Sequence, residues 1–156
     1  MTDGFYIEKA TVADAAAIAD IERECFSEPW SEKAVADEIT ADNVSFVVCK
    51  NACGCVAGYV SGRNNCGEFY VSNIAVTAHA RRCGVGESLI KQITGEAEKL
   101  GCEFITLEVR EHNTAARRLY EKCGFAVVGQ RKEFYRAPTE NAVLYTKLFN
   151  KSENLQ

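Results

Sequence analysis

The feature that most constrains the fold is an amphipathic helix pattern between two strand-like segments. Over residues 84–100, apolar side chains recur every three or four positions, which is the spacing of one helix face. These side chains are Val85, Leu89, Ile93, Ala97 and Leu100. Gly101 follows directly, and glycine commonly ends helices. With strand-like segments over 68–76 and 104–109, this order predicts a parallel pair of strands joined by a right-handed crossover.

The rest of the chain adds strands and helices to this unit. A capping box over 11–14 opens a first helix, and a second helix begins near Ser31. A third covers 113–122, with Asn113 as its N-cap and Gly124 at its end. The remaining strand-like segments are 5–9, 44–50, 55–61, 125–128 and 142–148. This order predicts an α/β protein with a mixed sheet.

Length and composition narrow the class of protein. The chain has 156 residues without repeats or linkers, so we expect one domain over 1–150 and a frayed polar tail over 151–156. Hydrophobic residues make up 47% and charged residues 26%, which excludes wholesale disorder. A net charge of -4 argues against nucleic-acid binding. No apolar run approaches the ~20 residues that span a bilayer, and residues 1–9 lack the apolar stretch of a signal peptide. We therefore expect a cytoplasmic protein without membrane contact.

The cysteine content raises the question of a metal site. There is no C-x-x-C pair, and His79 and His112 lie far apart, so the spacing does not favour zinc. Disulfides are not expected in the cytoplasm. We expect no metal, although a group of four cysteines remains an alternative zinc site: Cys49, Cys53, Cys55 and Cys66. We expect most cysteines to be small buried hydrophobes. The remaining four are Cys25, Cys83, Cys102 and Cys123.

A short glycine-containing segment precedes the long helix. Arg81-Arg82-Cys83-Gly84-Val85-Gly86 lies between a strand and the helix start. Glycines allow positive φ and close approach of a ligand, and free N–H groups at a helix start attract anions. The segment lacks the G-K-[ST] ending of a P-loop, and Leu89 stands where a dinucleotide fingerprint needs glycine. It therefore predicts either a phosphate site or an ordinary turn.

Several motifs together resemble one family. Asn73-Ile74-Ala75-Val76 followed by Arg81-x-x-Gly84-x-Gly86 is similar to the acetyl-CoA motif of GNAT acetyltransferases. Leu107-Glu108-Val109-Arg110, Asn113-x-Ala115-Ala116 and 119–125 resemble the second half of that family. Segments 25–31 and 134–142 are similar to its RimI-type ribosomal-protein-alanine N-acetyltransferases, except that Asn141 replaces an acid. The resemblance covers about residues 7–148. It implies a mostly antiparallel twisted sheet with a splayed parallel pair, flanked by about four helices.

The resemblance also implies how acetyl-CoA would be held. Backbone groups of Ile74, Ala75 and Val76 would pair with the pantetheine chain, and one N–H would stabilise the oxyanion. Asn113 would contact the cofactor as well as cap its helix. The pyrophosphate would lie in a cradle formed by Arg81, Arg82, Cys83, Gly84, Val85, Gly86 and Glu87.

The same resemblance assigns catalytic and substrate roles. Glu108 would take the proton of the amine, although a solvated carboxylate on an outer strand face is the alternative. Tyr120 would donate a proton to the departing sulfur, although a core aromatic residue is the alternative. Five further residues would shape the substrate groove, or else belong to the core: Phe26, Trp30, Phe134, Tyr135 and Arg136.

The predicted function follows from the resemblance. The chain would transfer an acetyl group from acetyl-CoA to the N-terminal α-amine of a protein, by direct attack in a ternary complex. The expected acceptor is the N-terminal alanine of a ribosomal protein, and we expect a monomer. Two alternatives remain: acetylation of a small amine or a protein lysine, and a non-catalytic acetyl-CoA sensor. The presence of both Glu108 and Tyr120 argues against the sensor, because binding alone requires neither.

Overall fold

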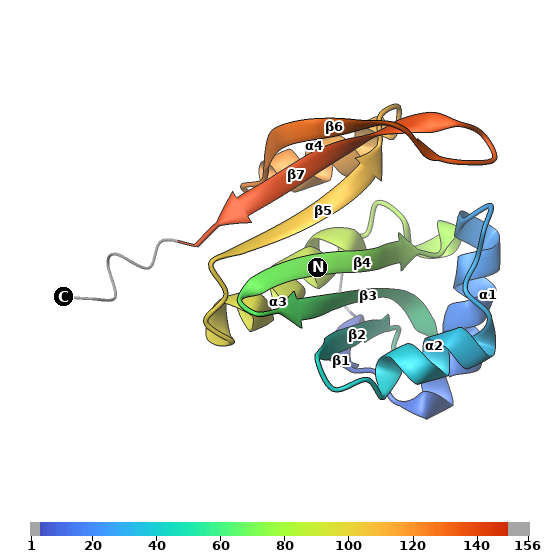
Figure 1. Ribbon diagram of the computed structural model, residues 1–156. Helices are drawn as coiled ribbons and strands as arrows, with labels where there is room; N and C mark the ends of the chain where they lie inside the picture. Colours follow the sequence, from blue (N-terminus) through green and yellow to red (C-terminus); the bar gives the residue numbers. More distant parts are fainter. Residues whose placement is uncertain (1–3, 150–156) are drawn as a thin grey trace.

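A seven-stranded sheet organises the structure (Figure 1). The computed structural model describes residues 4–149, and the strand order is β1-β2-β3-β4-β5-β7-β6. Neighbouring strands are antiparallel except for β4 and β5, which are parallel as the sequence predicted. The strands are β1 Tyr6–Lys9, β2 Val44–Lys50, β3 Val56–Asn65, β4 Glu68–Val76, β5 Phe104–Arg110, β6 Ala126–Tyr135 and β7 Glu140–Leu148.

Helices cover both faces of the sheet. One face carries α1 (Ala15–Cys25) and α2 (Glu32–Ile39), and the other carries α3 (Val85–Lys99) and α4 (Thr114–Lys122). Two 3-10 turns, η1 (Val12–Asp14) and η2 (Ala78–Ala80), precede α1 and α3. Within the described residues, no helix is long and apolar enough to cross a bilayer.

Strand alternation divides the core into two clusters. Val47 and Cys49 of β2 pack with α3, whereas Phe46 and Val48, one residue out of step, pack with α1 and α2. This is the two-residue period of a strand buried on both faces. Each large apolar side chain buried in this way contributes about 1.5–3 kcal/mol of transfer free energy. The sheet is therefore held from both sides, and among the strands α1 and α2 have their main contacts with β2, β3 and β4.

The predicted helix caps are present. Asp14 Oδ2 accepts a hydrogen bond from the Thr11 N–H over 2.9 Å, which is half of the predicted capping box. Ser31 Oγ accepts from the Ala34 N–H over 3.1 Å. These contacts satisfy backbone donors that have no partner within the helix.

Some predicted boundaries and burials were wrong. Strand β3 continues past 61 to Asn65, and β6 continues past 128 to Tyr135. The extension of β6 has mostly exposed side chains because it is an edge strand, so no apolar alternation marks it. Leu100 is 55% exposed because α3 ends at Lys99, which turns its last predicted apolar position out of the core.

The prediction that most cysteines are buried was also wrong. Only Cys49 and Cys102 are buried, because their positions lie inside the core, whereas Cys25, Cys83 and Cys123 pack at its margin. Three lie exposed in turns and strand ends, and the others are half-buried; the exposed ones are Cys53, Cys55 and Cys66. The tail predicted over 151–156 lies outside the described residues.

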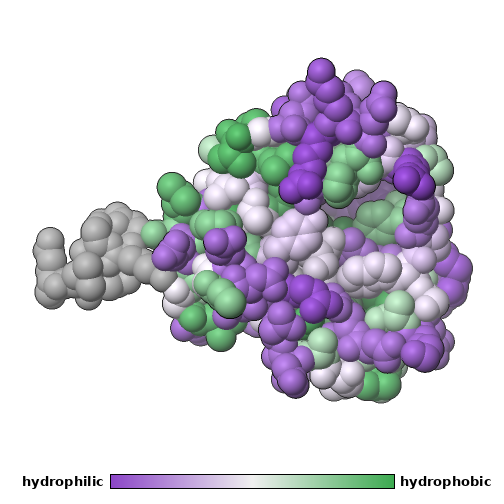
Figure 2. Space-filling model, viewed as in Figure 1, coloured by the Kyte–Doolittle hydropathy of each residue, from purple (hydrophilic) through white to green (hydrophobic). Residues whose placement is uncertain are grey.

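The parallel pair determines where the site lies. Strands β4 and β5 are paired only from Glu68 with Phe104 to Tyr70 with Thr106. Beyond that point β4 remains paired with β3, and β5 with β7, so the two strands diverge (Figure 1). Figure 2, viewed from the same side, shows a hollow in the surface where they separate. The backbone edge of β4 that faces this opening is left without a strand partner.

Candidate active site

Glu108 lies on β5, two residues past Thr106, which is the last residue of β5 that pairs with β4. Its strand neighbours Leu107 and Val109 point into the core beneath α3, so Glu108 points to the opposite face. On that face, the main strand contacts of α1 and α2 are with β2, β3 and β4 rather than with β5. Nevertheless the Glu108 side chain is only 8% exposed. It is a nearly buried carboxylate at the mouth of the opening.

The two oxygens of Glu108 have different surroundings. Oε1 accepts a hydrogen bond from the Tyr70 hydroxyl over 2.6 Å, across the point where β4 and β5 separate. Arg131 Nε of β6 lies 3.4 Å from Oε2 as an ion pair. Within the described part of the chain, Oε2 is buried and accepts no hydrogen bond. Burying an acceptor of this kind costs free energy unless a donor forms a hydrogen bond with it. One carboxylate oxygen thus accepts a hydrogen bond from the protein, and the other has the Arg131 ion pair as its contact among the described residues.

Tyr70 remains a donor at neutral pH. Burial, followed by the hydrogen bond and the charge of Glu108, raises the pKa of the Tyr70 phenol well above its usual range. A phenol that keeps its proton donates to the carboxylate and stabilises its charged form. Tyr70 therefore orients Glu108 with a charge-assisted hydrogen bond.

Tyr120 lies on α4 and is 4% exposed. Its ring packs against Phe125 and Tyr145, with centroids 6.0 Å and 5.9 Å away. Burial raises the pKa of the Tyr120 phenol above its usual range, and the neighbouring Tyr135 and Cys123 raise it further. The residue is both a core aromatic and a protonated hydroxyl, so the two interpretations of the sequence are compatible.

The glycine-containing segment has two left-handed residues at the start of α3. Arg82 has a φ of 64° and Gly84 a φ of 80°, both left-handed, and Gly84 is the N-cap of α3. Alternation of this kind turns successive backbone N–H groups toward one point. A Cβ on Gly86 would lie 3.3 Å from Leu119 Cδ2, so the absence of a side chain lets α3 and α4 approach. The segment can hold a pyrophosphate with backbone groups.

The negative charge beside the glycine-containing segment is paired with nearby lysines. Glu87 is paired with Lys122 over 2.6 Å and with Lys91 over 3.2 Å, so its charge is offset. Arg81 Nε donates to the Val76 carbonyl over 3.2 Å. Asn113 Oδ1 accepts from the Ala116 N–H over 3.2 Å, which makes it the N-cap of α4. Its predicted capping role is thereby confirmed.

The predicted pantetheine strand lies along the opening. Ile74, Ala75 and Val76 are paired with β3 on one side and lie beyond the end of pairing with β5 on the other. Ala75 is buried beneath α1, while Ile74 and Val76 pack against the α3 side. Backbone groups on the free edge of this segment can pair with an extended ligand.

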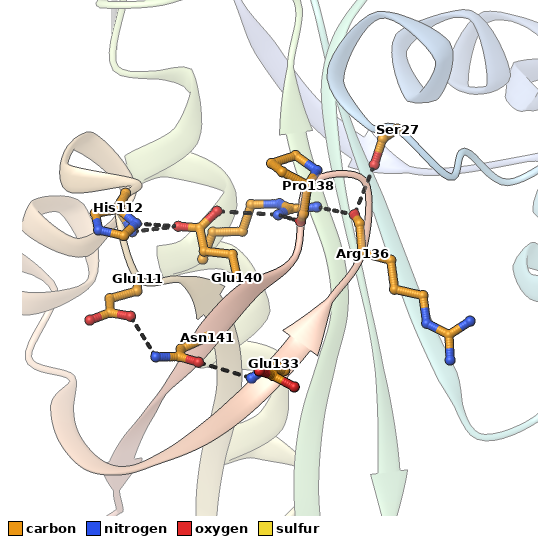
Figure 3. A network of polar contacts seen from close by, with 9 residues as sticks. Ser27, Glu111, His112, Glu133, Arg136, Pro138, Glu140 and Asn141 are labelled. Atoms are coloured by element: carbon orange, nitrogen blue, oxygen red, sulfur yellow. Dashed lines mark hydrogen bonds and ion pairs between the residues drawn. The ribbon is translucent and has the colours of Figure 1, made fainter.

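The turn between β6 and β7 forms one wall beside Glu108. Phe134 is 42% exposed and meets the Tyr135 ring edge-on, with centroids 5.1 Å apart. Arg131, which pairs with Glu108, also lies over the Phe134 ring at 5.7 Å. The Arg136 carbonyl accepts hydrogen bonds, while its side chain points away from the turn (Figure 3). The structure thus links Phe134 to Glu108 through Arg131, and the charge of Glu108 acts on Tyr135.

Phe26 and Trp30 have a different position. Both are partly buried and pack against the cluster beneath α1 and α2. This position agrees with the alternative that they belong to the core. The Trp30 N–H donates to Glu22 Oε1 over 2.7 Å. Glu22 is fully buried and also accepts from Tyr59 and from Asn73 Nδ2, the latter over 2.9 Å. Burial raises the pKa of the Glu22 carboxyl, and the hydrogen bonds from Trp30 and Asn73 counteract that rise. This network fixes the segment between α1 and α2 beside β4.

Sequence reasoning missed three residues of the site. Tyr70, Arg110 and Arg131 all lie within contact of Glu108 or its neighbouring turn. Only strand register could have revealed Tyr70, because its partnership with Glu108 spans 38 positions. Within residues 4–149, no three His, Cys, Asp or Glu side chains gather where they could hold a metal ion.

Comparison with known proteins identifies the family. Residues 15–125 match the acetyltransferase (GNAT) family. A relative from Escherichia coli strain K12, the ribosomal protein bS18-alanine N-acetyltransferase, is 33% identical over 129 residues, or 83% of this chain and 86% of that protein. The N-alpha-acetyltransferase RimI of Mycobacterium tuberculosis is 30% identical over 147 residues, or 90% of each chain.

A solved structure agrees with this assignment. The crystal structure of the ribosomal-protein-S18-alanine N-acetyltransferase from Escherichia coli has a TM-score of 0.84 and 29% identity, covering 92% of this chain and 93% of that chain. The expected fold, with its splayed parallel pair and four helices, is confirmed. The chain therefore belongs to the GNAT acetyltransferase family.

Proposed function

We propose that this protein transfers the acetyl group of acetyl-CoA to the N-terminal α-amine of a protein, with the N-terminal alanine of a ribosomal protein as the acceptor. The observation that carries this proposal is the Glu108 carboxylate. One of its oxygens is held by Tyr70, and the other is a buried acceptor at the point where β4 and β5 separate. Such an acceptor is suited to take a proton from an attacking amine.

Glu108 acts as the general base. An α-amine has a reference pKa of roughly 7.7–8.0, against about 10.4 for a lysine side chain. A carboxylate is basic enough to remove the proton from an α-amine, directly or through a water. Oε2 receives this proton, while the Tyr70 hydroxyl stays on Oε1. The nitrogen lone pair then attacks the thioester carbonyl.

The remaining groups stabilise the oxyanion and the leaving group. A backbone N–H of the Ile74–Val76 segment donates to the oxyanion as the tetrahedral centre forms. When the C–S bond breaks, Tyr120 donates its proton to the thiolate. Burial keeps that phenol protonated across the neutral pH range. The amine nitrogen gives one proton to Glu108 before it attacks and loses a second as the amide forms. This second proton returns to Tyr120 and replaces the one given to the thiolate, so the reaction balances.

Binding of the donor is assigned to the turn before α3. The left-handed Arg82 and Gly84 direct N–H groups at the pyrophosphate, and Arg81 and Arg82 add positive charge. The free edge of β4 receives the pantetheine chain, which places the thioester beside Glu108. Asn113 lies at the start of α4, next to this path. The ribosomal acceptor places the reaction in the cytoplasm.

The choice of acceptor rests on the relatives. The Escherichia coli and Mycobacterium tuberculosis proteins are named for acetylation of a protein α-amine, and each aligns with over 80% of this chain. Asn141 replaces the acid of the RimI-type pattern. Its Nδ2 donates to Glu111 Oε2 over 2.9 Å and its Oδ1 accepts from the Glu133 N–H over 2.9 Å. A neutral amide satisfies both neighbours there, so the replacement is accommodated without disturbing the turn.

The proposal is tested by turnover with defined peptides. The full chain is mixed with acetyl-CoA and with peptides that differ only in their first residue, and release of CoA is followed. A lysine peptide with a blocked N-terminus is the comparison, and Glu108→Gln is the matched base-deficient variant. We expect turnover with free N-termini and fastest turnover with alanine. We also expect the deficit of Glu108→Gln to narrow as the pH rises through roughly 7.7–8.0, where the amine arrives neutral. Acetylation of the blocked lysine peptide alone would overturn the proposal.

A further inference from the structure

Arg110, the last residue of β5, is bound to the turn between β6 and β7. Its Nη2 donates to the Arg136 carbonyl and its Nη1 to the Pro138 carbonyl, each over 2.9 Å. Nη1 also lies 3.2 Å from Glu140 Oε1 in an ion pair. Arginine presents several N–H groups in one rigid plane, which lysine does not. The guanidinium therefore binds three groups of one turn at once.

The turn has a backbone that needs such support. Ala137, between the two carbonyls that Arg110 binds, has a φ of 50° in the left-handed region. This conformation costs a residue other than glycine about 1–2 kcal/mol. It persists only where surrounding contacts enforce it. The two hydrogen bonds from Arg110 flank this residue and supply that enforcement.

Arg110 also fixes the aromatic ring beside the base. Its guanidinium carbon lies 4.5 Å from the centroid of the Tyr135 ring. Burial, and then the charge of Glu108, raise the pKa of Tyr135 to about 12. Tyr135 in turn raises the pKa of Tyr70 and of Tyr120. The ring therefore lies within electrostatic reach of the proposed base, its orienting partner and the proposed acid.

Further contacts attach the same turn to both sides of the opening. Ser27 Oγ, after α1, donates to the Arg136 carbonyl over 3.4 Å. The His112 N–H donates to Glu140 Oε2 over 2.7 Å, and the ring Nδ1 lies 3.0 Å from the same oxygen. Figure 3 shows Ser27, His112 and Glu140 at the turn; they come from the segment after α1, the segment after β5 and the start of β7. Arg110 stands at the centre of this arrangement.

We propose that Arg110 is a positioning residue for the acceptor: it holds the turn over 135–140 and the Tyr135 ring against the catalytic strand, so that an incoming peptide meets a preformed wall beside Glu108. The proposal rests on the proposed function, because the wall serves an acceptor that enters at the opening. Arg110 itself exchanges no proton with the substrate. Arg110 contributes by keeping the turn ordered before the peptide binds, so that peptide binding does not carry the entropy cost of ordering it.

The chain offers a matched control. Arg63 of β3 is paired with Glu38 of α2, and the side-chain exposures of this pair are 38% and 12%. Those of Arg110 and Glu140 are 29% and 12%. Both pairs join an arginine on a strand to a nearly buried glutamate, but Arg63 lies on the far side of β4 from the turn. Arg63→Gln therefore removes a comparable ion pair without touching the proposed wall.

The experiment compares Arg110→Gln and Arg110→Lys with Arg63→Gln and the wild type. KM and kcat are measured with a peptide carrying an N-terminal alanine, and the Kd of acetyl-CoA is measured by calorimetry. We expect both Arg110 variants to lose about 10- to 100-fold in kcat/KM for the peptide, mainly through KM. Arg110→Lys should restore little of the lost kcat/KM, because a lysine side chain cannot bind both carbonyls. The Kd of acetyl-CoA should stay at the wild-type value, and Arg63→Gln should resemble the wild type.

A second readout needs no activity. Trypsin cleavage after Arg136 is followed by mass spectrometry, because cleavage requires the turn to open. We expect faster cleavage in both Arg110 variants and a wild-type rate in Arg63→Gln. A wild-type KM together with a wild-type cleavage rate in the Arg110 variants overturns the proposal, as does an equal peptide defect in Arg63→Gln. If the wild type turns over no peptide, the proposed function fails, and the cleavage rate still decides whether Arg110 holds the turn.

Discussion

The Tyr70 hydroxyl donates to Glu108 Oε1 over 2.6 Å at the place where β4 and β5 cease to pair. The two strands are parallel, so residues 38 positions apart in sequence meet at the mouth of the opening. Tyr70 remains protonated because burial and the charge of Glu108 raise its pKa. The contact engages Oε1, whereas Oε2 is buried without a hydrogen-bond donor among the described residues.

Tyr70→Phe tests whether this contact matters to catalysis. The substitution removes the hydroxyl and keeps the ring, so Glu108 loses its orienting donor. A hydrogen bond to a charged group contributes about 1.5–3 kcal/mol, so we expect kcat to fall about 10- to 100-fold. The Kd of acetyl-CoA should not change. Tyr6→Phe, at a 43% exposed position on β1, is the control. Equal kcat values for Tyr70→Phe and the wild type would remove Tyr70 from the mechanism.

Tyr120→Phe tests the proposed acid. Phenylalanine fills the same space against Phe125 and Tyr145, so the packing should survive. Loss of a positioned proton donor costs about 10²–10⁴ in kcat. We expect this loss in steady-state turnover, with acetyl-CoA bound as tightly as by the wild type. If the variant turns over at the wild-type rate, Tyr120 is a core aromatic and nothing more.

Gly84→Val tests the phosphate cradle. Gly84 has a φ of 80°, and a β-branched residue is strained in this conformation and blocks approach of the phosphate. We expect the Kd of acetyl-CoA to rise by at least about tenfold in calorimetry. Gly95→Ala in the same helix is the control, because a Cβ there meets no atom within 4 Å. It should bind acetyl-CoA as the wild type does. Wild-type affinity in a folded Gly84→Val would contradict the cradle.

Alkaline pH should destabilise the fold through its buried phenols. Burial raises the pKa of Tyr70, Tyr120, Tyr135 and Tyr145 above the usual phenol range. Above about pH 10 the unfolded chain releases protons that the folded chain retains, so the unfolded state binds fewer protons and stability falls as pH rises.

The free energy of unfolding in urea, measured between about pH 9 and about pH 11, checks this expectation. Each fully buried phenol adds a slope of up to about 1.4 kcal/mol per pH unit, and the half-buried Tyr135 adds less because of solvent screening. Tyr120→Phe should have a shallower slope than the wild type, whereas Tyr6→Phe should keep the wild-type slope. Identical slopes in all three proteins would show that Tyr120 ionises freely in the fold.

Local sequence patterns were sufficient to predict the ends of strands that are regularly packed on both faces. The boundaries of β2 and β4 were predicted to the residue, because both strands are buried on two faces and flanked by turns. Asn113 was recognisable because the capping role depends on the sequence nearby. Strand β6 was cut short at 128, because its edge position leaves the following polar residues exposed. Exposed edge strands have no apolar alternation to mark them.

The site was predictable only in part for a similar reason. Glu108 and Tyr120 were identified through the family resemblance, and strand alternation placed Glu108 on the correct face. The contacts of Tyr70 and Arg110 join residues that are distant in sequence. These contacts depend on the register of β5 with β4 and β7, which cannot be predicted from a single sequence. Phe26 and Trp30 were assigned to the groove, but their packing beneath α1 depends on the buried Glu22 network.

The position of the acetyl group on one peptide tests the central claim most directly. The substrate is a peptide with a free N-terminal alanine and an internal lysine, incubated with the full chain and acetyl-CoA. Tandem mass spectrometry then identifies which nitrogen carries the acetyl group. The account predicts acetylation of the α-nitrogen and an unmodified lysine, because Glu108 can deprotonate an amine of pKa roughly 7.7–8.0 far more readily than one of about 10.4. Acetylation of the lysine with a free N-terminus left unmodified would contradict it.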